Sequence, residues 1–440
     1  MCVGYFLVLL DVSVMNVALP RLGAQFHVEG ALLAWTVTGY SVPFASLLLV
    51  GGATGDRVGH RPVVLAGLVV FGVASLGCAL APGVGWLIGA RAVQGVGAAL
   101  LLPGTLAVVA RAFSDDRERA KAISVWVAIG GVALLAGPVL GGVLVATAGW
   151  RAVFLLNVPL VAAALVPAFR VLPRDPGDRD RQPDLLGTAI GTAGLALLVA
   201  GVTQSNWVLA ASAVPAIGLF IVVERRQSEP VLPLRLFADR QFTLANLGAV
   251  VMNSTTLGML FLLTQYLQNI KGLDPLRSGL AVLPSEVLLV ALPPLSGRLV
   301  ARFGPPPVAT IALTVNAAGL ALLTVASPTA SYLALVPALV LWGMGLGLLT
   351  PALVSGAVSA VPSAQAGLAS AVNNTARQSG GALGTAACAA IAGPVSGAGF
   401  MTGFRLSAVI TAGVCVAMAA ITGLLNRVRA VAPSAVRTES

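Results

Sequence analysis

Apolar residues fall into fourteen long stretches along this chain, separated by short polar segments. Most stretches are close to the roughly 17–25 residues that an α-helix needs to cross the hydrocarbon core of a bilayer. The pattern therefore predicts an all-α membrane protein with fourteen transmembrane helices. The expected spans are 2–20, 33–53, 63–81, 86–110, 122–148, 152–172, 185–203, 207–223, 242–264, 279–300, 307–326, 332–358, 366–392 and 404–425.

Two longer polar segments divide these spans. Residues 173–184 and 224–241 bracket the seventh and eighth spans, so the expected arrangement is six, two and six helices. We accordingly divide the chain into an N-terminal bundle of six helices at 1–172, two additional helices with flanking cytoplasmic loops at 173–240, and a C-terminal bundle of six helices at 241–440.

A weak internal repeat supports this division. A glycine, an arginine and a second glycine follow the second span and recur at the same offsets after the tenth, as Gly52, Arg57 and Gly59 and as Gly297, Arg302 and Gly304. Duplicated bundles around a cavity at the bilayer midplane are a common plan of transporters.

Composition excludes a water-soluble protein. Charged residues make up only 10% of the chain and hydrophobic residues 57%, whereas soluble domains carry about a quarter charged residues. The net charge of +10 comes mostly from basic residues in short loops, so the expected partner is the lipid bilayer and not nucleic acid. With the N-terminus inside, nineteen basic residues lie on the cytoplasmic side and five outside. This bias predicts a multi-pass plasma-membrane protein with both termini in the cytoplasm.

Neither a metal site nor a cofactor is expected. The four cysteines lie far apart, and the only histidines are His27 and His60. No Gly-Lys-Ser/Thr follows the glycine-rich stretches, so ATP is not the expected energy source. Clustered nucleophiles are also lacking, which argues against an enzyme. The first apolar run contains Asp11, unlike an ordinary signal peptide. Because almost nothing precedes that run, a start codon upstream of Met1 remains an open alternative.

Four charged residues fall well inside the expected spans, more than three residues from either end: Asp11, Arg91, Glu286 and Arg377. A charge at the bilayer centre costs about 2.5–3.5 kcal/mol on insertion scales, so such residues usually face a cavity or a partner. A structural ion pair that fixes helix packing is the simpler alternative. Because desolvation favours the neutral form of a carboxyl group, Asp11 and Glu286 are candidate proton carriers. Acids in opposite halves would let protons compete with a cationic substrate.

Polar and small residues at membrane depth complete the candidate set. Some polar side chains are expected to line a substrate cavity, and others to join helices; the cavity candidates are Asn16, Gln94, Asn253, Gln265, Asn373 and Arg377. Gly137, Pro138, Gly141 and Gly142 lie together in the fifth span, where small residues allow close helix approach and proline weakens the helical hydrogen bonding.

Several sequence segments, in order along nearly the whole chain, resemble those of the major facilitator superfamily, specifically its fourteen-helix drug:proton antiporters of the multidrug efflux type. The segments are Leu10-Asp11 through Asn16 to Pro20, Gly52 to Arg61, Arg91 to Gly97, Gly137 to Gly142, Trp150 to Pro159 and Ala369 to Gly381. The resemblance is specific for the family and much less so for the substrate. It implies the major-facilitator fold.

The resemblance also implies roles for individual residues. Asp11 would take part in proton coupling with Arg91 supporting it, and Glu286 is added from its setting in the membrane. Gly52, Asp56, Arg57 and Arg61 would form a conformational latch between the halves. Ala301 stands where the second copy would need the counterpart of Asp56, which argues against a symmetric latch.

The expected function is proton-coupled export of drugs or amphipathic metabolites by alternating access, in a monomer. A cationic substrate is one option. A dedicated exporter of one secondary metabolite is an alternative within transport, and a transport-inactive sensor or scaffold is the alternative from another class.

Overall fold

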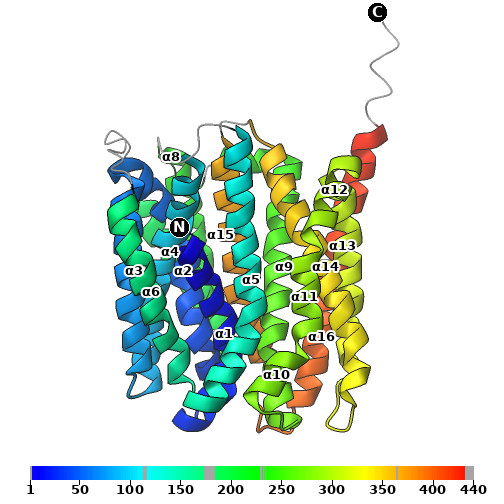
Figure 1. Cartoon of the computed structure of the whole chain (residues 1–440). Helices are drawn as coiled ribbons and strands as arrows, with labels where there is room; N and C mark the ends of the chain where they lie inside the picture. The colour runs from blue at the N-terminus through cyan, green and yellow to red at the C-terminus, as the bar shows by residue number, and fades with distance from the viewer. Residues whose placement is uncertain are drawn as a thin grey trace, which may run out of the picture.

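The apolar stretches form long helices that run side by side between two loop faces (Figure 1). The structure is a computed structural model, and it describes residues 2–431 except 112–115, 173–183, 228–229, 231, 233 and 363–364. Four of the nineteen basic residues expected on the cytoplasmic side lie outside the described residues: Arg174, Arg179, Arg181 and Arg437. Residues 173–183, the start of the expected segment 173–240, also lie outside the described residues.

The described residues before 227 form eight helices. They are α1 (Cys2–Phe26), α2 (Gly30–Val58), α3 (His60–Ala79), α4 (Val84–Arg111), α5 (Asp116–Ala148), α6 (Arg151–Val171), α7 (Leu185–Thr203) and α8 (Trp207–Arg226). The remaining elements are η1 (Leu234–Ala238), α9 (Arg240–Gln265), η2 (Tyr266–Ile270), α10 (Pro275–Ala281), α11 (Leu283–Ala291), α12 (Pro293–Phe303), α13 (Pro305–Leu322), η3 (Leu323–Val325), α14 (Tyr332–Ser359), α15 (Ala366–Ala392) and α16 (Phe400–Val431).

Twelve helices of the described chain are long and apolar enough to cross a membrane. The number rises to thirteen if α11 and α12, which bend by 46° at their junction, are counted as one span. The long helix outside this set is α15, whose apolar character is lowered by Asn373, Asn374, Arg377 and Gln378. It packs between α2 and α9.

The break between α10, α11 and α12 was missed by the sequence prediction, which expected one span over 279–300. Pro284 stands near the start of α11, and Pro293 and Pro294 open α12. Proline lacks the backbone N–H that continues a helix and its ring clashes with the preceding turn, so each proline favours a new helix start. The polar network described below lies in α1, α2, α3, α4 and α6, away from this broken segment.

We call the loop face that carries the end of α16 the tail face (upper in Figure 1) and the opposite one the far face. Gly59 joins α2 to α3 and Gly304 joins α12 to α13, both at the tail face. Their φ angles are 94° and 82°, a region that glycine adopts far more readily than other residues. The repeat seen in the sequence therefore includes two matching tight turns.

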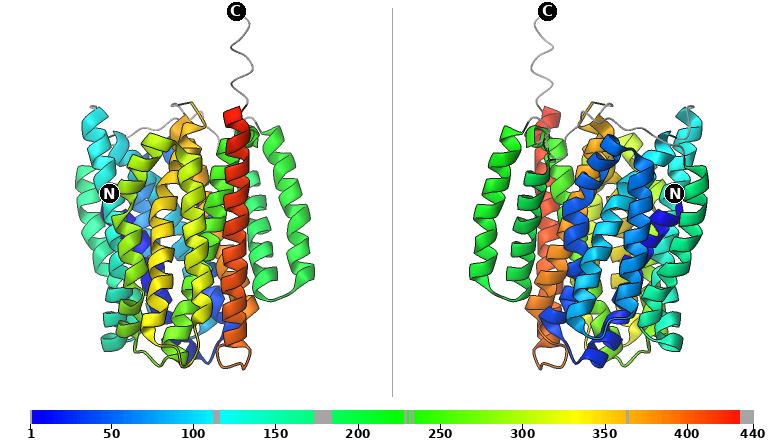
Figure 2. Two further views of the ribbon diagram at one scale, coloured as in Figure 1. Left: turned by 90° about the vertical axis from the view of Figure 1, so that its right-hand side faces the viewer. Right: turned by 90° about the vertical axis from the view of Figure 1, so that its left-hand side faces the viewer.

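Helices α7 and α8 stand at one edge of the bundle (Figure 2). Helix α7 packs against α2 and α15, and α8 packs mainly on α7. Several large apolar side chains of α8, including Trp207, Val208 and Val214, are exposed. An exposed apolar surface of this kind is what a lipid-facing helix requires.

Glycines in the middle of α5 allow it to pack tightly between two helices. A Cβ on Gly141 would lie 3.0 Å from Val14 of α1, whereas one on Gly142 would lie 2.6 Å from the Cα of Leu276 in α10. Small residues let helix backbones approach closely in membranes. Helix α5 continues through Pro138 without a break.

A buried ion pair as the candidate functional site

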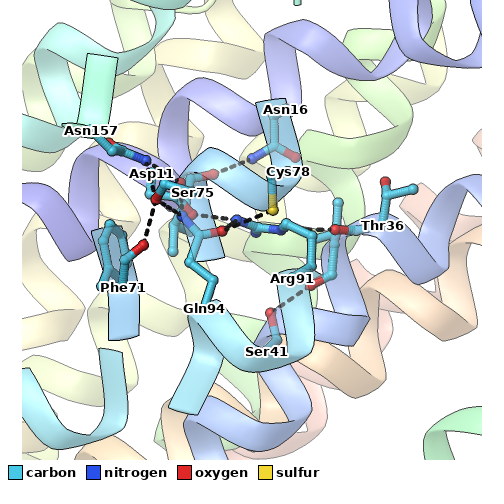
Figure 3. A network of polar contacts seen from close by, with 12 residues as sticks. Asp11, Asn16, Thr36, Ser41, Phe71, Ser75, Cys78, Arg91, Gln94 and Asn157 are labelled. Atoms are coloured by element: carbon cyan, nitrogen blue, oxygen red, sulfur yellow. Dashed lines mark hydrogen bonds and ion pairs between the residues drawn. The ribbon is translucent and has the colours of Figure 1, made fainter. Parts of the chain in front are cut away.

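An ion pair lies in the interior of the bundle (Figure 3). Asp11 is in the middle of α1 and Arg91 is in the second turn of α4, and Arg91 Nη1 pairs with Asp11 Oδ2. The side chains are 0% and 1% exposed, respectively. Both charges are therefore removed from solvent, which is favourable only when the ions and their remaining hydrogen-bonding groups are satisfied.

Two amides complete the coordination of the carboxylate. Gln94 Nε2 and Asn157 Nδ2 donate to Asp11 Oδ1 over 2.8 and 2.9 Å. Arg91 Nη1 also donates to Gln94 Oε1 over 2.7 Å. Since Arg91 and Gln94 are three residues apart, they share one face of α4 and reach the same carboxylate together.

The hydroxyl of Ser75 on α3 links the two amides. It accepts from Gln94 Nε2 at 2.9 Å and from Asn157 Nδ2 at 3.3 Å, and donates to the carbonyl of Phe71 at 2.7 Å. The network thus connects α1, α3, α4 and α6 (Figure 3). Such a satisfied polar network fixes the relative position of the helices it joins.

Helix α2 holds the other side of the guanidinium. Arg91 Nε donates to the carbonyl of Thr36 over 3.1 Å, and its Cζ lies 4.3 Å from the centre of the Tyr40 ring. An aromatic face attracts a cation, more strongly when both are desolvated. If Asp11 took up a proton, Arg91 would therefore still keep contacts with α2.

Glu286, the second predicted acid, lies in a different setting. It is half-buried in the first turn of α11, and among the described residues no hydrogen bond or ion pair reaches its carboxyl group. Among the described residues no hydrogen bond or ion pair joins Glu286 to Asp11 or its network, so the structure does not pair the two acids.

Three of the six predicted cavity residues join helices in this conformation: Gln94, Asn253 and Asn373. Asn253 of α9 donates to the carbonyl of Arg377 over 2.7 Å, and Asn373 of α15 donates to that of Ala245 over 3.3 Å. Asn16 donates to the carbonyl of Val12 within α1. Gln94 belongs to the Asp11 network, and Gln265 accepts from Asn269. Arg377 is half-buried, and its Nε is buried without an acceptor among the described residues.

The predicted latch residues lie at the tail-face end of α2 and the start of α3. Asp56 Oδ1 lies 3.3 Å from His60 Nε2, and Arg61 Nη2 donates to the carbonyl of Phe169 in α6 over 2.7 Å. Gly52 faces Pro103 of α4, and Arg57 is half-buried. These contacts all lie among the first six helices, and a role of the four residues as a latch between halves remains a prediction.

The family model described as Major Facilitator Superfamily matches residues 1–385. The chain belongs to this superfamily. The similar "Multidrug resistance protein Stp" of Mycobacterium tuberculosis is 34% identical over 87% of this chain and 73% of its own length. "Cephamycin export protein CmcT" of Amycolatopsis lactamdurans is 36% identical over 89% and 84%. "Lincomycin resistance protein" of Streptomyces lincolnensis is 35% identical over 86% and 80%.

A solved structure supports the fold. The structure titled "Crystal structure of peptide transporter POT in complex with sulfate" aligns with 97% of this chain and 93% of that chain, with a TM-score of 0.73 and 14% identity. At this identity the likeness concerns the fold alone. The chain is thus a multi-pass membrane transporter of the major facilitator superfamily, related to drug and antibiotic efflux and resistance proteins.

Two members of the polar network in this major facilitator transporter were not assigned to the site from sequence. Asn157 stood out only as a polar residue at membrane depth within a family-like segment, and Ser75 gave no signal beyond a hydroxyl in an apolar span. Asn157 lies 146 residues from Asp11. A spacing of that length carries no information about contact, so the fold was needed to find it.

Proposed function

We propose that this transporter exports drugs or amphipathic metabolites and uses the proton gradient to drive the transport. The observation that carries the proposal is the buried pair of Asp11 and Arg91 with its amide shell. A structural ion pair would need no more than two charges and their solvation. Here the carboxylate is reached from α4 and α6 at once, and Ser75 of α3 holds both amides that donate to it, so its charge state affects how several helices pack.

The proposed coupling follows from charge balance. With Asp11 ionised, the carboxylate and the guanidinium neutralise each other inside the bundle. A proton on Asp11 would leave the Arg91 charge buried without its counter-ion, which is strongly unfavourable. The helices could relieve this cost by moving so that Arg91 gains water or another partner. Proton binding would thereby favour one conformation over the other by its differential free energy.

Contacts between the two bundles support an alternating-access mechanism. At the far face, Ser396 Oγ donates to the Glu29 carboxylate, and Gln268 Nε2 donates to the carbonyl of Val17 over 2.9 Å. The two bundles also approach closely where Gly142 of α5 packs on Leu276 of α10, since a Cβ on Gly142 would lie 2.6 Å from the Leu276 Cα. We assign this conformation to the state that is closed at the far face, and transport would require these contacts to separate.

We further propose fourteen spans in a six, two and six arrangement. It counts α15 as a span together with the twelve apolar helices and the α11–α12 pair. The polar residues of α15 would be tolerated because the helix packs between α2 and α9. Helices α7 and α8 would then be the two additional helices at the edge. The excess of basic residues in the tail-face loops would place both termini in the cytoplasm.

The names of the relatives suggest the class of cargo. They include a multidrug resistance protein, a cephamycin exporter and a lincomycin resistance protein. We propose that this chain carries molecules of comparable size and amphipathic character. A dedicated exporter of one such metabolite is compatible with the same site.

The test is transport in proteoliposomes with and without an imposed pH gradient, comparing wild type with the double variant Asp11→Asn/Arg91→Gln. The double variant removes the titratable carboxyl without leaving a buried charge unpaired. We expect uptake driven by the pH gradient in wild type and its loss in the variant. Asp274→Asn, which alters an exposed ion pair with Arg277, serves as the matched control and should transport normally. Gradient-driven uptake by the double variant at the wild-type rate would remove Asp11 from the mechanism.

A further inference from the structure

Arg377 is a cation of the membrane interior that lacks a counter-ion in this structure. It lies near the middle of α15, and no carboxylate of the described chain forms an ion pair with it. Its Nε is buried without an acceptor, while the side chain as a whole is half-buried and so reaches open space. An unpaired arginine at membrane depth is costly, and such residues usually mark a pathway or a ligand.

An aromatic platform, formed by Tyr5 of α1 and Trp126 of α5, lies within electrostatic range of Arg377 in α15. Its hydroxyl-bearing ring belongs to Tyr5, which interacts electrostatically with the Arg377 guanidinium. Tyr5 stacks on Trp126 of α5 with the ring centres 3.6 Å apart and the planes 11° from parallel. Tyr5 is half-buried, whereas Trp126 is 6% exposed. Trp126 therefore supports the Tyr5 ring from the inside.

Close packing around Tyr5 and backbone hydrogen bonds around Arg377 hold the two residues in place. Gly130 follows Trp126 by one helical turn, and a Cβ there would lie 2.7 Å from Tyr5 Cζ, so the space is shaped for the ring. On the other side, Asn253 donates to the carbonyl of Arg377, and Ser254 Oγ donates to that of Gly380 over 2.8 Å. These bonds fasten α15 to α9 through the backbone and leave the guanidinium unused.

The two acids predicted inside the spans, Asp11 and Glu286, do not neutralise this arginine. Asp11 is fully engaged by Arg91 and two amides. Glu286 has no polar partner among the described residues and no electrostatic interaction with Arg377. The free charge beside the aromatic platform is thus positive, which argues against a cationic cargo group at this point.

We propose that Arg377 binds the anionic group of an amphipathic aromatic cargo whose apolar part contacts the ring of Tyr5. The guanidinium would donate charge-assisted hydrogen bonds to a carboxylate or similar anion, and the adjacent ring would contact the apolar part. The inference rests on the proposed export function, because it assigns a chemical class to the exported molecule. It replaces the cationic option of the sequence analysis with an anionic one.

The test measures equilibrium binding of three probes that share one ring system to the full chain in detergent micelles at neutral pH. The probes are 1-pyrenebutyrate, its methyl ester and 1-pyrenebutylamine, which are anionic, neutral and cationic. We expect wild type to bind the carboxylate most tightly. Arg377→Gln should weaken carboxylate binding by about 10- to 100-fold and leave ester binding within about threefold. Arg377→Lys should retain part of the preference, because it keeps the charge and loses the planar fork.

Two controls make the outcome decisive. Arg405→Gln removes an exposed arginine whose guanidinium donates to the carbonyl of Ala326 near the far face, and should leave the preference intact. Tyr5→Leu should weaken all three probes alike, since it removes ring contact without changing charge. Wild type that binds the amine or the ester as tightly as the carboxylate would overturn the proposal, even if an Arg377 variant fails to fold.

Two further arms separate possible sources of the anion and separate this inference from the export function. If phosphatidylglycerol added to the micelles abolishes carboxylate binding, the occupant is a lipid headgroup and the assignment to cargo is wrong. In proteoliposomes, pH-driven uptake that does not depend on Arg377 would refute the inference alone. Carboxylate binding that depends on Arg377 without pH-driven uptake would support the site and refute proton-coupled export.

Discussion

The replacement Asp11→Asn tests how strongly the buried pair contributes to stability. The carboxylate accepts from Arg91, Gln94 and Asn157. The amide that replaces it turns an N–H₂ group toward one of these donors. It also removes the anionic partner that Arg91 has among the described residues. A lost hydrogen bond to a charged group costs about 1.5–3 kcal/mol, and breaking a buried pair by removing one partner costs about 3–5 kcal/mol in all. We expect Asp11→Asn to lower the unfolding free energy by about 3–5 kcal/mol.

The assay is equilibrium unfolding of the purified chain in mixed micelles, followed by near-ultraviolet circular dichroism. The matched control is Asp274→Asn, because Asp274 pairs with Arg277 at 3.2 Å but both side chains are exposed, at 44% and 77%. That variant should lose less than about 1 kcal/mol, as expected for a surface pair. Asparagine also preserves the cap that Asp274 provides at the start of α10.

A double-mutant cycle then isolates the pair. Adding Arg91→Gln to Asp11→Asn should recover at least about 1 kcal/mol relative to the single variant, because no unpaired charge remains. If Asp11→Asn unfolds within about 1 kcal/mol of wild type, or if the two changes simply add, the pair is not a coupled buried charge and the reasoning about proton coupling loses its basis.

Three shorter predictions concern other regions. Glu286→Gln should keep the unfolding free energy within about 1 kcal/mol of wild type, because no polar contact is lost, while the pH dependence of transport becomes flatter; a marked loss of stability would indicate an undetected partner. Gly345→Ala should lower the unfolding free energy by about 1–3 kcal/mol, because its Cβ would lie 2.6 Å from the backbone of α13. Gly413→Ala, whose Cβ would have no atom within 4 Å, should be neutral or stabilising. Equal effects of the two variants on the unfolding free energy would contradict this reasoning. Gly279→Val should separate α5 from α10, because a Cβ there would already lie 2.7 Å from the Pro138 carbonyl carbon. A cysteine introduced at the far-face end of α9 should then be labelled faster. Unchanged labelling would argue against a contact between α5 and α10 that keeps the far face closed.

The sequence was sufficient to find the centre of the candidate site. Asp11 and Arg91 are two of four charges inside otherwise apolar spans, and the cost of placing them there makes each one informative. Their pairing, however, depends on how α1 and α4 cross. Gln94 was assigned to a cavity from its residue type, and the structure places it in the Asp11 network because it shares a face of α4 with Arg91.

The elements themselves were predicted unevenly. The expected span 366–392 coincides with α15, and the turn at Gly149 separates α5 from α6 as expected. The tenth span was wrong in detail, since 279–300 includes parts of α10, α11 and α12. Hydropathy reports the length of an apolar run but not its axis, and a bend of 46° leaves the apolar count nearly unchanged.

The polar character of α15 has a consequence for how the chain is assembled. On insertion scales, central asparagine, glutamine and arginine residues oppose entry of a helix into lipid by itself. Helices α2 and α9, against which α15 packs, are both synthesised earlier. We therefore expect this segment to enter the bilayer only after its two neighbours have been inserted. Deletion of α9 alone, or disruption of α2, would then leave α15 outside the bilayer.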